Sequence, residues 1–327
     1  MADSTDIGEI NSVSLSLTAP VPLTEHPAAV YLASLGAGSR RTMEQALNAI
    51  PTERFAIAKI LTGNICDALT LDWSKLRYKH TAAVRVILME KYAPATANKM
   101  LSALRRVLKE TVRLELMDAN DFARAVDIPC IKSGRELKGR CLSEGEIDAL
   151  MQVCFADPTP IGYRDAALIA ILRGAGLRRG EVVNLNLSDF KAGSLKILSG
   201  KGSKDRTVYL PDGAVTVVKD WLKVRGPEAG ALFCHINKAG VVTLRQLSSQ
   251  AVLLILEKRG KEAGVSEFSP HDFRRTFISD LLDSGVDIVT VQKLVGHATT
   301  DQTARYDRRG EETKRQAVQF ISVPRRK

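Results

Sequence analysis

Residues 296–306 read Gly296-His297-Ala298-Thr299-Thr300-Asp301-Gln302-Thr303-Ala304-Arg305-Tyr306, so a tyrosine stands nine residues after a Gly-His pair. Alone, His297 is equally well explained as a side chain at a helix end, and Tyr306 as an ordinary half-buried tyrosine. The interpretation of this stretch therefore depends on the residues that precede it in the chain.

Three further clusters precede it. In Gly174-Ala175-Gly176-Leu177-Arg178-Arg179-Gly180-Glu181, Arg178 stands three residues before Glu181. Lys201 lies in Gly200-Lys201-Gly202-Ser203-Lys204, which is a good hairpin turn whether or not it takes part in chemistry. In Ser269-Pro270-His271-Asp272-Phe273-Arg274, the i, i+3 spacing places His271 and Arg274 on the same helix face.

The ordered set Arg178, Lys201, His271-x-x-Arg274, Gly296-His297 and Tyr306 resembles the tyrosine recombinase (phage integrase) family. The resemblance covers roughly residues 142 to 310, and more loosely the region before them. It implies a site-specific DNA recombinase that cleaves and rejoins strands through a 3′-phosphotyrosine intermediate and a Holliday junction, with no metal, ATP or other cofactor. The partners that it implies are double-stranded DNA recombination sites, a dimer of this chain on each site, a tetramer on paired sites, and accessory DNA-binding proteins.

The chemistry explains why these residue types belong together. Attack on a phosphodiester adds negative charge to its nonbridging oxygens, so fixed cations stabilise the transition state more than the ground state. Guanidinium is planar, permanently charged and bidentate towards phosphate, which suits Arg178 and Arg274 to this task. The ester formed by Tyr306 keeps the bond energy, so a 5′-hydroxyl can reseal the strand.

The remaining roles come from the resemblance. It implies that Lys201 is the general acid for the leaving oxygen, that His271 shuttles the proton of Tyr306, and that His297 donates a hydrogen bond to the phosphate. Arg179 and Arg275 are direct neighbours of the two chosen arginines, and one helical step rotates a side chain by about 100°. The family pattern favours Arg178, and the shared face with His271 favours Arg274.

Two alternative functions stay open. A type IB topoisomerase uses related chemistry without joining two sites, although the His271-x-x-Arg274 and Gly296-His297 context fits the recombinase pattern better. An inactive relative that only occupies DNA as an accessory factor would not need a nucleophile, an acid and two cationic clamps.

Two nucleotide-binding motifs fail on inspection. Gly174-x-Gly176 has its third glycine, Gly180, one position too late for a dinucleotide loop. Around Gly200-Lys201, Leu195 replaces the first glycine of a P-loop and Gly202 replaces its Ser or Thr. The five cysteines contain no Cys-x-x-Cys pair and no nearby histidine pair, so we predict reduced core thiols and no metal site at Cys66, Cys130, Cys141, Cys154 and Cys234.

The composition agrees with a DNA partner. The 327 residues carry a formal net charge of +10, and a surplus of this size favours a polyanion. No apolar run is long enough for a membrane span, and the acidic start Met1–Asp6 lacks the basic flank of a secretory signal. We therefore expect no membrane partner and a cytoplasmic location.

The expected fold is mainly α with a small β-sheet, in which a helical core-binding domain precedes a mixed α/β tyrosine-recombinase catalytic domain. We predict a flexible tail at 1–25, the core-binding domain at 26–128, a basic linker at 129–141 and the catalytic domain at 142–327. A capping box, with Ser143 at the N-cap and Glu146 at N3, begins the catalytic domain.

The clearest helical pattern runs from Ala95 to Leu116. On a helical wheel one face is apolar, with Ala97, Leu101, Leu104, Leu108 and Val112, and we predict that it is buried. The other face is basic and is either a solvated surface or a row of phosphate contacts. The resemblance to the core-binding domain favours DNA contacts by Lys99, Arg106, Lys109 and Arg113.

Within the catalytic domain we predict helices near 164–174, 179–187, 213–224, 244–264, 272–284 and 288–294. Strands are expected at 194–198 and 206–210, on either side of the Lys201 turn, and a further hairpin at 232–235 and 241–243. The C-terminal apolar residues Ala317, Val318, Phe320 and Ile321 are too few for a domain. We expect this segment to dock, either on its own domain or on a neighbouring protomer.

Overall fold

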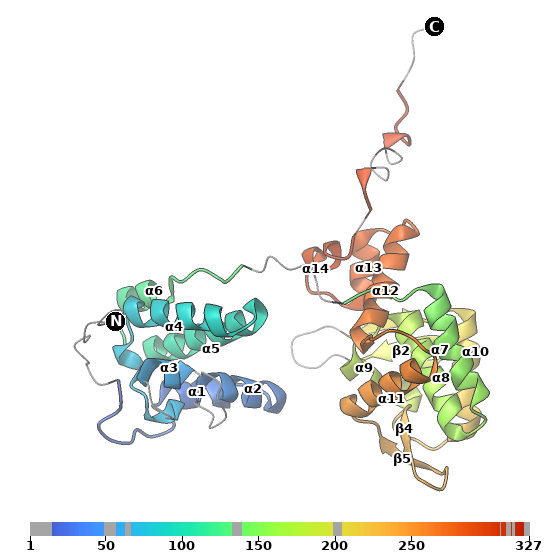
Figure 1. Cartoon of the computed structure of the whole chain (residues 1–327), viewed down its shortest axis with the longest axis horizontal. Coiled ribbons are helices and arrows are strands. Elements are labelled where there is room, and N and C mark those ends of the chain that lie inside the picture. Colours follow the sequence, from blue (N-terminus) through green and yellow to red (C-terminus); the bar gives the residue numbers. More distant parts are fainter. Residues whose placement is uncertain are drawn as a thin grey trace, which may run out of the picture. The chain divides into compact units, whose positions relative to one another are not determined.

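The computed structural model describes residues 15–48, 57–62, 67–132, 139–198, 205–307, 309–311, 315 and 318–323. The described part of the chain is mostly helical and contains two small antiparallel sheets, as the sequence predicts (Figure 1). It divides into two compact units, Met1–Glu136 and Leu137–Lys327, and the division falls inside the range predicted as linker.

The first unit is built around one amphipathic helix. Helix α5 (Pro94–Arg113) contacts α1 (Pro27–Ala33), α2 (Ala37–Leu47), α4 (Tyr78–Lys91) and α6 (Ala119–Val126). The unit also holds α3 (Ile57–Thr62) and two 3₁₀ turns, η1 (Ala68–Thr70) and η2 (Trp73–Lys75). The predicted apolar face of α5 is confirmed, because Val112 packs against the core and full burial is found for Ala97, Leu101, Leu104 and Leu108.

The predicted flexible tail is wrong for its last part. The backbone N–H of Leu17 donates to the carbonyl of Thr70 at 2.9 Å, and that of Asp72 donates to the carbonyl of Leu15 at 2.7 Å. Residues 15–17 are therefore paired with the chain beside η1. Residues 1–14 lie outside the described part.

Several helices of the second unit pack against α8 (Pro160–Ala175), which is buried along most of its length. A three-stranded sheet has the order β1 (Phe190–Lys191), β2 (Ser194–Ile197), β3 (Arg206–Tyr209), and a two-stranded sheet joins β4 (Cys234–Ile236) to β5 (Val242–Gln246). The other helical segments are α7 (Glu144–Ala156), α9 (Arg179–Val183), η3 (Leu187–Asp189), α10 (Asp212–Arg225), α11 (Ser249–Glu262), α12 (Pro270–Asp283), α13 (Ile288–Val295) and α14 (Thr300–Ala304).

Several details differ from the sequence prediction. The helix expected from residue 244 begins at Ser249, because the chain continues as β5 to Gln246. Helix α9 ends at Val183 rather than at 187, and β1 and α14 were not predicted at all. These elements are two to five residues long, too short for hydrophobic periodicity to reveal. The capping box at the start of α7 is confirmed, with Glu146 N donating to Ser143 Oγ at 3.2 Å.

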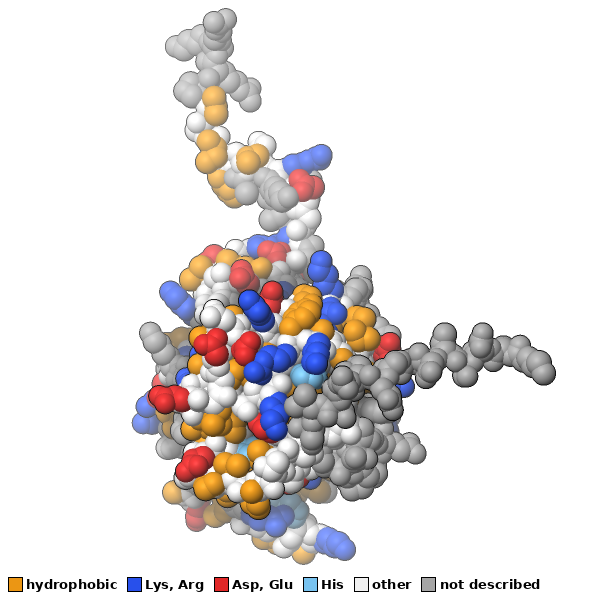
Figure 2. All heavy atoms as spheres, turned by 90° about the vertical axis from the view of Figure 1, so that its left-hand side faces the viewer, with side chains coloured by type: hydrophobic (Ala, Val, Ile, Leu, Met, Phe, Trp, Pro, Cys, Tyr) orange, Lys and Arg blue, Asp and Glu red, His pale blue; other side chains and the backbone are white. Residues whose placement is uncertain are grey.

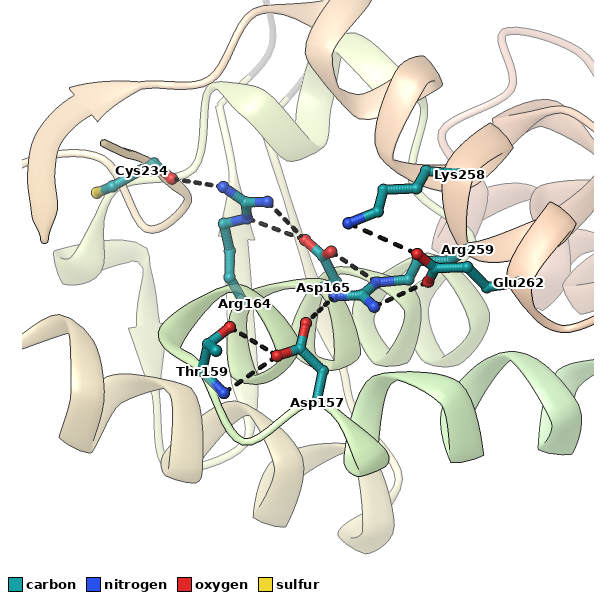
Figure 3. A network of polar contacts seen from close by, with 8 residues as sticks. All are labelled: Asp157, Thr159, Arg164, Asp165, Cys234, Lys258, Arg259 and Glu262. Atoms are coloured by element: carbon teal, nitrogen blue, oxygen red, sulfur yellow. Dashed lines mark hydrogen bonds and ion pairs between the residues drawn. The ribbon is translucent and has the colours of Figure 1, made fainter. Parts of the chain in front are cut away.

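A buried ion-pair network fixes α8 against α11 (Figure 3). Arg259 on α11 donates through Nε to Asp165 Oδ2 at 2.9 Å and through Nη2 to Asp157 Oδ2 at 2.6 Å. Arg164 donates to the other oxygen of Asp165 at 2.8 Å. Since Arg259 and Asp165 are almost fully buried, removing either partner would leave an uncompensated charge in the core.

Both ends of the predicted linker are held by the unit that they adjoin. Asn98 on α5 exchanges two hydrogen bonds of 2.8 Å with the backbone of Ile131, and Arg85 donates to the carbonyl of Pro129. At the other end, Arg140 is bonded to the second unit. Residues 133–138 lie outside the described part.

The cysteine prediction is partly right. Cys154 and Cys234 are buried thiols, and burial raises the pKa of Cys154 to about 12. Cys130 is exposed and Cys141 is only half-buried, so they are not core residues, and Cys66 lies outside the described part. The prediction fails for Cys130 because it lies in the extended chain after α6.

The described apolar side chains of the C-terminal segment are exposed. Phe320 is 88% exposed, and Val318, Ile321 and Val323 are also exposed. They appear as hydrophobic groups along the segment at the top of Figure 2. Ala317, which was predicted to dock with them, lies outside the described part. Among the described helices, none is long and apolar enough to cross a membrane.

Candidate active site

Three arginines from different elements meet at the C-terminal end of α13. Arg206 Nε donates to the carbonyl of Leu294 at 2.8 Å, and Arg274 Nη2 donates to that of Val295 at 2.6 Å. Arg178 Nη2 donates to the next carbonyl, that of Gly296, at 3.0 Å. The last carbonyls of a helix have no partner within it and carry its partial negative charge, so they are natural acceptors for cations.

Gly296 makes this arrangement possible. It ends α13 in the left-handed conformation, with φ of 65°, which favours glycine. A β-carbon there would lie 2.9 Å from Arg206 Nη1. The glycine of the Gly-His pair therefore turns the chain and leaves room for the guanidinium, which brings His297 into the site directly afterwards.

Glu181 holds two of the arginines. Its carboxylate accepts from Arg178 Nη1 at 2.9 Å and from Arg206 Nη1 and Nη2 at 3.0 and 2.8 Å. Burial alone would raise its pKa, but the hydrogen bonds from Arg206 and the backbone of Arg178, with both positive charges, lower the pKa to about 2. Glu181 is therefore charged at neutral pH and fixes the direction of both guanidinium groups.

Arg274 is the most deeply placed of the three. It comes from α12, is 1% exposed, and donates through Nη1 to the carbonyl of Gly176 at 2.8 Å as well as to Val295. Burial, followed by the charge of Arg178, lowers the pKa of Arg274 to about 9, so the group keeps its charge at neutral pH. A buried cation bonded to neutral carbonyls leaves its charge available to an incoming anion.

Tyr306 lies beside these cations, just after α14. Its hydroxyl oxygen is 3.1 Å from His271 Nε2, which is within hydrogen-bonding distance. The ring of His297 stacks on the tyrosine ring with centroids 6.0 Å apart, and the Arg275 guanidinium carbon lies 5.3 Å from the tyrosine centroid. Both side chains thus lie against the tyrosine ring, while its hydroxyl is close to His271.

Both histidines are neutral at pH 7. Burial, then the charges of Arg274 and Arg275, lowers the pKa of His271, although Asp272 opposes the shift. Burial and then Arg274 lower the pKa of His297 to about 4, and its Nδ1 lies 2.9 Å from Thr303 Oγ1. A neutral His271 can accept the proton of Tyr306, which an imidazolium could not.

The structure brings together five of the six residues predicted for catalysis: Arg178, His271, Arg274, His297 and Tyr306. The sixth, Lys201, lies outside the described residues. Sequence reasoning missed Arg206, and used Glu181 only as a spacing marker. The available signal for Arg206 was its position as the first residue of the strand after the Lys201 turn. Among the described residues, no three His, Cys, Asp or Glu side chains converge as a metal site.

The predicted DNA contacts lie on α5 of the first unit. Lys99 and Lys109 are exposed, whereas Arg106 and Arg113 share the nearly buried carboxylate of Glu110. The nitrogen–oxygen distances to Glu110 Oε1 are 3.4 Å for Arg106 and 3.0 Å for Arg113. Glu110 was not considered on the helical wheel, and it lowers the net charge of the predicted basic face.

Comparisons with known proteins agree with this geometry. Residues 140–312 match the model of the phage integrase family. The chain is 32% identical over 275 residues to tyrosine recombinase XerC of Proteus mirabilis. The alignment covers 81% of this chain and 85% of the relative.

Solved structures show the same fold. The integrase of transposon Tn1549, in complex with transposon right-end DNA, superposes with a TM-score of 0.66 at 14% identity, covering 90% of this chain and 99% of the other. A lambda integrase tetramer bound to a Holliday junction gives a TM-score of 0.60 at 16% identity, covering 87% and 76%. Fold and sequence thus agree on the class of tyrosine recombinases. The chain belongs to the phage integrase family.

Proposed function

We propose that this protein is a site-specific DNA recombinase that cuts and rejoins strands through a 3′-phosphotyrosine at Tyr306. The observation that best supports this proposal is the 3.1 Å distance from the Tyr306 hydroxyl to His271 Nε2. Next to this pair, three arginines donate to successive backbone carbonyls at the end of α13. A nucleophile, a neutral proton acceptor and fixed cations are the parts that phosphodiester transfer needs.

The proposed cleavage step transfers the phosphoryl group from the 5′-oxygen of the next nucleotide to Tyr306. The Tyr306 oxygen bonds to phosphorus while its proton passes to His271, and the bond from phosphorus to the 5′-oxygen of the next nucleotide breaks. Charge on the nonbridging oxygens is stabilised by Arg178 and Arg274, with a hydrogen bond from His297. Lys201 gives a proton to the departing 5′-oxygen. Resealing is the reverse reaction with a 5′-hydroxyl from another strand, so no ATP is required.

We propose that Arg206 and Glu181 support this step without touching the phosphate. Glu181 bonds both Arg178 and Arg206, and Arg206 bonds the end of α13. Loss of Arg206 or Glu181 would leave the Arg178 guanidinium free to move away from the carbonyl of Gly296. Catalytic groups need positions fixed to a fraction of an ångström, so this support affects rate more than binding.

The proposed substrate is a pair of double-stranded DNA sites, with a dimer of this chain on each and a tetramer at a Holliday junction. The family, the +10 charge and the solved tetramer of lambda integrase support it. We also propose that the reaction takes place in the cytoplasm. The first unit would be the core-binding domain and the second the catalytic domain, with Lys99, Arg106, Lys109 and Arg113 along phosphates.

The exposed C-terminal residues support the self-association. Phe320 and Ile321 are 88% and 70% exposed, which is unusual for two adjacent large apolar side chains. A neighbouring protomer on DNA would cover them. Accessory DNA-binding proteins are further proposed partners.

The test is to trap the covalent adduct. The protein is incubated without metal or ATP on nicked suicide duplexes taken from the DNA that flanks its gene, and detergent-resistant protein on DNA is measured. We expect an adduct with the wild type and none with Tyr306→Phe. Specific binding without an adduct would contradict the enzyme and favour the accessory binder, whereas relaxation of plasmids of any sequence would favour the topoisomerase.

A further inference from the structure

The C-terminal end of the interdomain linker is bonded to the helix that carries His271 and Arg274. The backbone N–H of Arg140 donates to Asp272 Oδ1 at 3.0 Å, and that of Leu142 donates to Thr276 Oγ1 at 2.8 Å. The Arg140 side chain also donates to the carbonyls of Ser266 and Glu267, just before α12. Residues 139–142 therefore cannot move without disturbing the first turns of α12.

Gly139 shows how closely the two segments approach. Its φ is +107°, a conformation that side chains rarely adopt. A β-carbon there would lie 2.5 Å from Asp272 Oδ1 and 3.1 Å from Arg275 Nη2. The linker backbone thus passes directly over Asp272 and Arg275 at a position where only glycine fits without displacing them.

These two residues lead to the nucleophile. Asp272 Oδ2 accepts from Ser269 N and Oγ, both at 2.9 Å, which fixes the carboxylate. Its Oδ1 lies 3.8 Å from Arg275 Nε, and the Arg275 guanidinium carbon lies 5.3 Å from the centroid of the Tyr306 ring. Asp272 and Arg275 are 5% and 3% exposed, and a cation over an aromatic ring is strongest when it is shielded from water.

We propose that Asp272 and Arg275 are positioning residues that connect the linker to Tyr306. The backbone at 139–140 places Asp272, Asp272 places Arg275, and Arg275 holds the tyrosine ring so that its hydroxyl reaches His271. The proposal rests on the proposed function, because it treats Tyr306 as the nucleophile. It predicts that the path of the chain into the catalytic unit influences the rate of strand cleavage.

A pair of glycine variants of the full-length protein tests the linker contact. Gly139→Ala puts a methyl group against Asp272, whereas Gly145→Ala puts one on α7 where no atom lies within 4 Å. On suicide duplexes under single-turnover conditions, we expect Gly139→Ala to slow adduct formation about tenfold, as for a small misplacement of a reacting group, with an unchanged Kd for DNA. Gly145→Ala should match the wild type.

Side-chain variants test the remaining steps. We expect Arg275→Met to slow cleavage about tenfold and Arg275→Lys to recover most of the rate, because lysine still places a cation over the ring. Asp272→Asn should slow cleavage to a similar degree. Asp280→Asn is the matched control, because it removes another ion pair of α12, 2.5 Å long to Arg173, on residues not placed at Tyr306.

Each outcome tests a different step of the proposal. Wild-type rates in Arg275→Met, or equal losses in its methionine and lysine variants, would overturn the positioning role. A normal rate in Gly139→Ala would overturn the connection to the linker, and Asp272→Asn supplies the same test if Gly139→Ala does not fold. A wild-type protein that forms no Tyr306-dependent adduct would instead refute the proposed function.

Discussion

Two arginines of this protein, Arg274 in the second unit and Arg113 in the first, are held in opposite ways. Arg274 on α12 is 1% exposed, and its two terminal nitrogens donate to backbone carbonyls. The side chain of Arg113 on α5 is 55% exposed and pairs with the carboxylate of Glu110. Carbonyls orient a cation without cancelling its charge, whereas a carboxylate cancels it.

The difference separates rate from affinity. A buried, oriented cation is already arranged for charge that develops in a transition state, and water does not weaken its field. An exposed arginine acts on DNA chiefly by displacing counterions, and Glu110 reduces what Arg106 and Arg113 can contribute together. Variants at the arginines around Tyr306 should therefore change the cleavage rate, and variants on α5 should change the salt dependence of binding.

The largest expected effect is at Lys201. Lys201→Ala should slow cleavage of normal DNA about 10²- to 10⁴-fold, the usual contribution of a general acid. It should recover on a duplex whose leaving oxygen is replaced by sulfur, which leaves without a proton. Lys204→Ala, three residues further along the chain, is the control and should behave as the wild type on both substrates. Absence of recovery would rule out the acid role and leave Lys201 as a further cation.

Arg274→Ala tests the buried side of the comparison. We expect a loss of about 10² to 10³ in cleavage rate, as for comparable groups that stabilise anions, with little change in Kd. Arg274→Lys should be nearly as slow, because lysine cannot reach two carbonyls in one plane. Rates come from single-turnover adduct formation.

Arg225→Ala is the matched control for that variant. Arg225 is also buried and donates to carbonyls, those of Ala231 and Glu228. Its loss should lower the melting temperature without slowing the folded enzyme. If Arg225→Ala slows cleavage as much as Arg274→Ala, the effect at Arg274 is structural and the comparison fails.

The hydrogen bonds of the site explain which of its residues can be predicted from the sequence. Arg178, His271, His297 and Tyr306 lie in recognisable spacings, because each belongs to a short local motif. Arg206 could not be found in that way, since its partners Glu181 and Leu294 lie 25 and 88 residues away.

The acceptors of the arginines were also invisible. They are backbone carbonyls at the end of α13, and every residue has a carbonyl, so only the folded chain shows which ones meet. The first unit gave the converse result: the periodicity of α5 predicted its buried face correctly, because burial follows helical spacing directly. The same wheel missed the pairing of Arg106 with Glu110, one turn away.

The acid limb of the pH–rate profile is the next prediction. The pKa of His271 is lowered from 6.5 and that of His297 to about 4, so both rings are neutral above pH 6.5 and gain protons as the pH falls towards 4. We expect kcat/KM for cleavage to be flat from pH 7 to 8 and to fall below pH 6.5, by up to tenfold per unit, once His271 is protonated.

The free energy of unfolding should fall with decreasing pH, as the cleavage rate does. The two histidines bind protons at a higher pH in the unfolded chain than in the folded one. Their contribution to the free energy of unfolding is therefore fully present above pH 6.5 and is lost as the pH falls towards 4. Melting temperatures across this range separate unfolding from loss of the proton acceptor. A rate that still rises steeply between pH 7 and 8 would contradict a neutral His271, whereas DNA binding by α5 should show no such limb.

The smallest effect is expected on α5. If Arg106 contacts a phosphate, Arg106→Ala should reduce the slope of log K against log salt by about one unit and leave the cleavage rate at saturating DNA unchanged. Arg124→Ala, an exposed arginine on α6, is the control and should leave the slope as it is. Because Glu110 is shared, removing Arg106 leaves the carboxylate to Arg113, so the double variant should lose less than the sum of the two single variants. A slope unchanged by Arg106→Ala would make the basic face of α5 an ordinary solvated surface, and the exposed lysines Lys99 and Lys109 would then be the next residues to test.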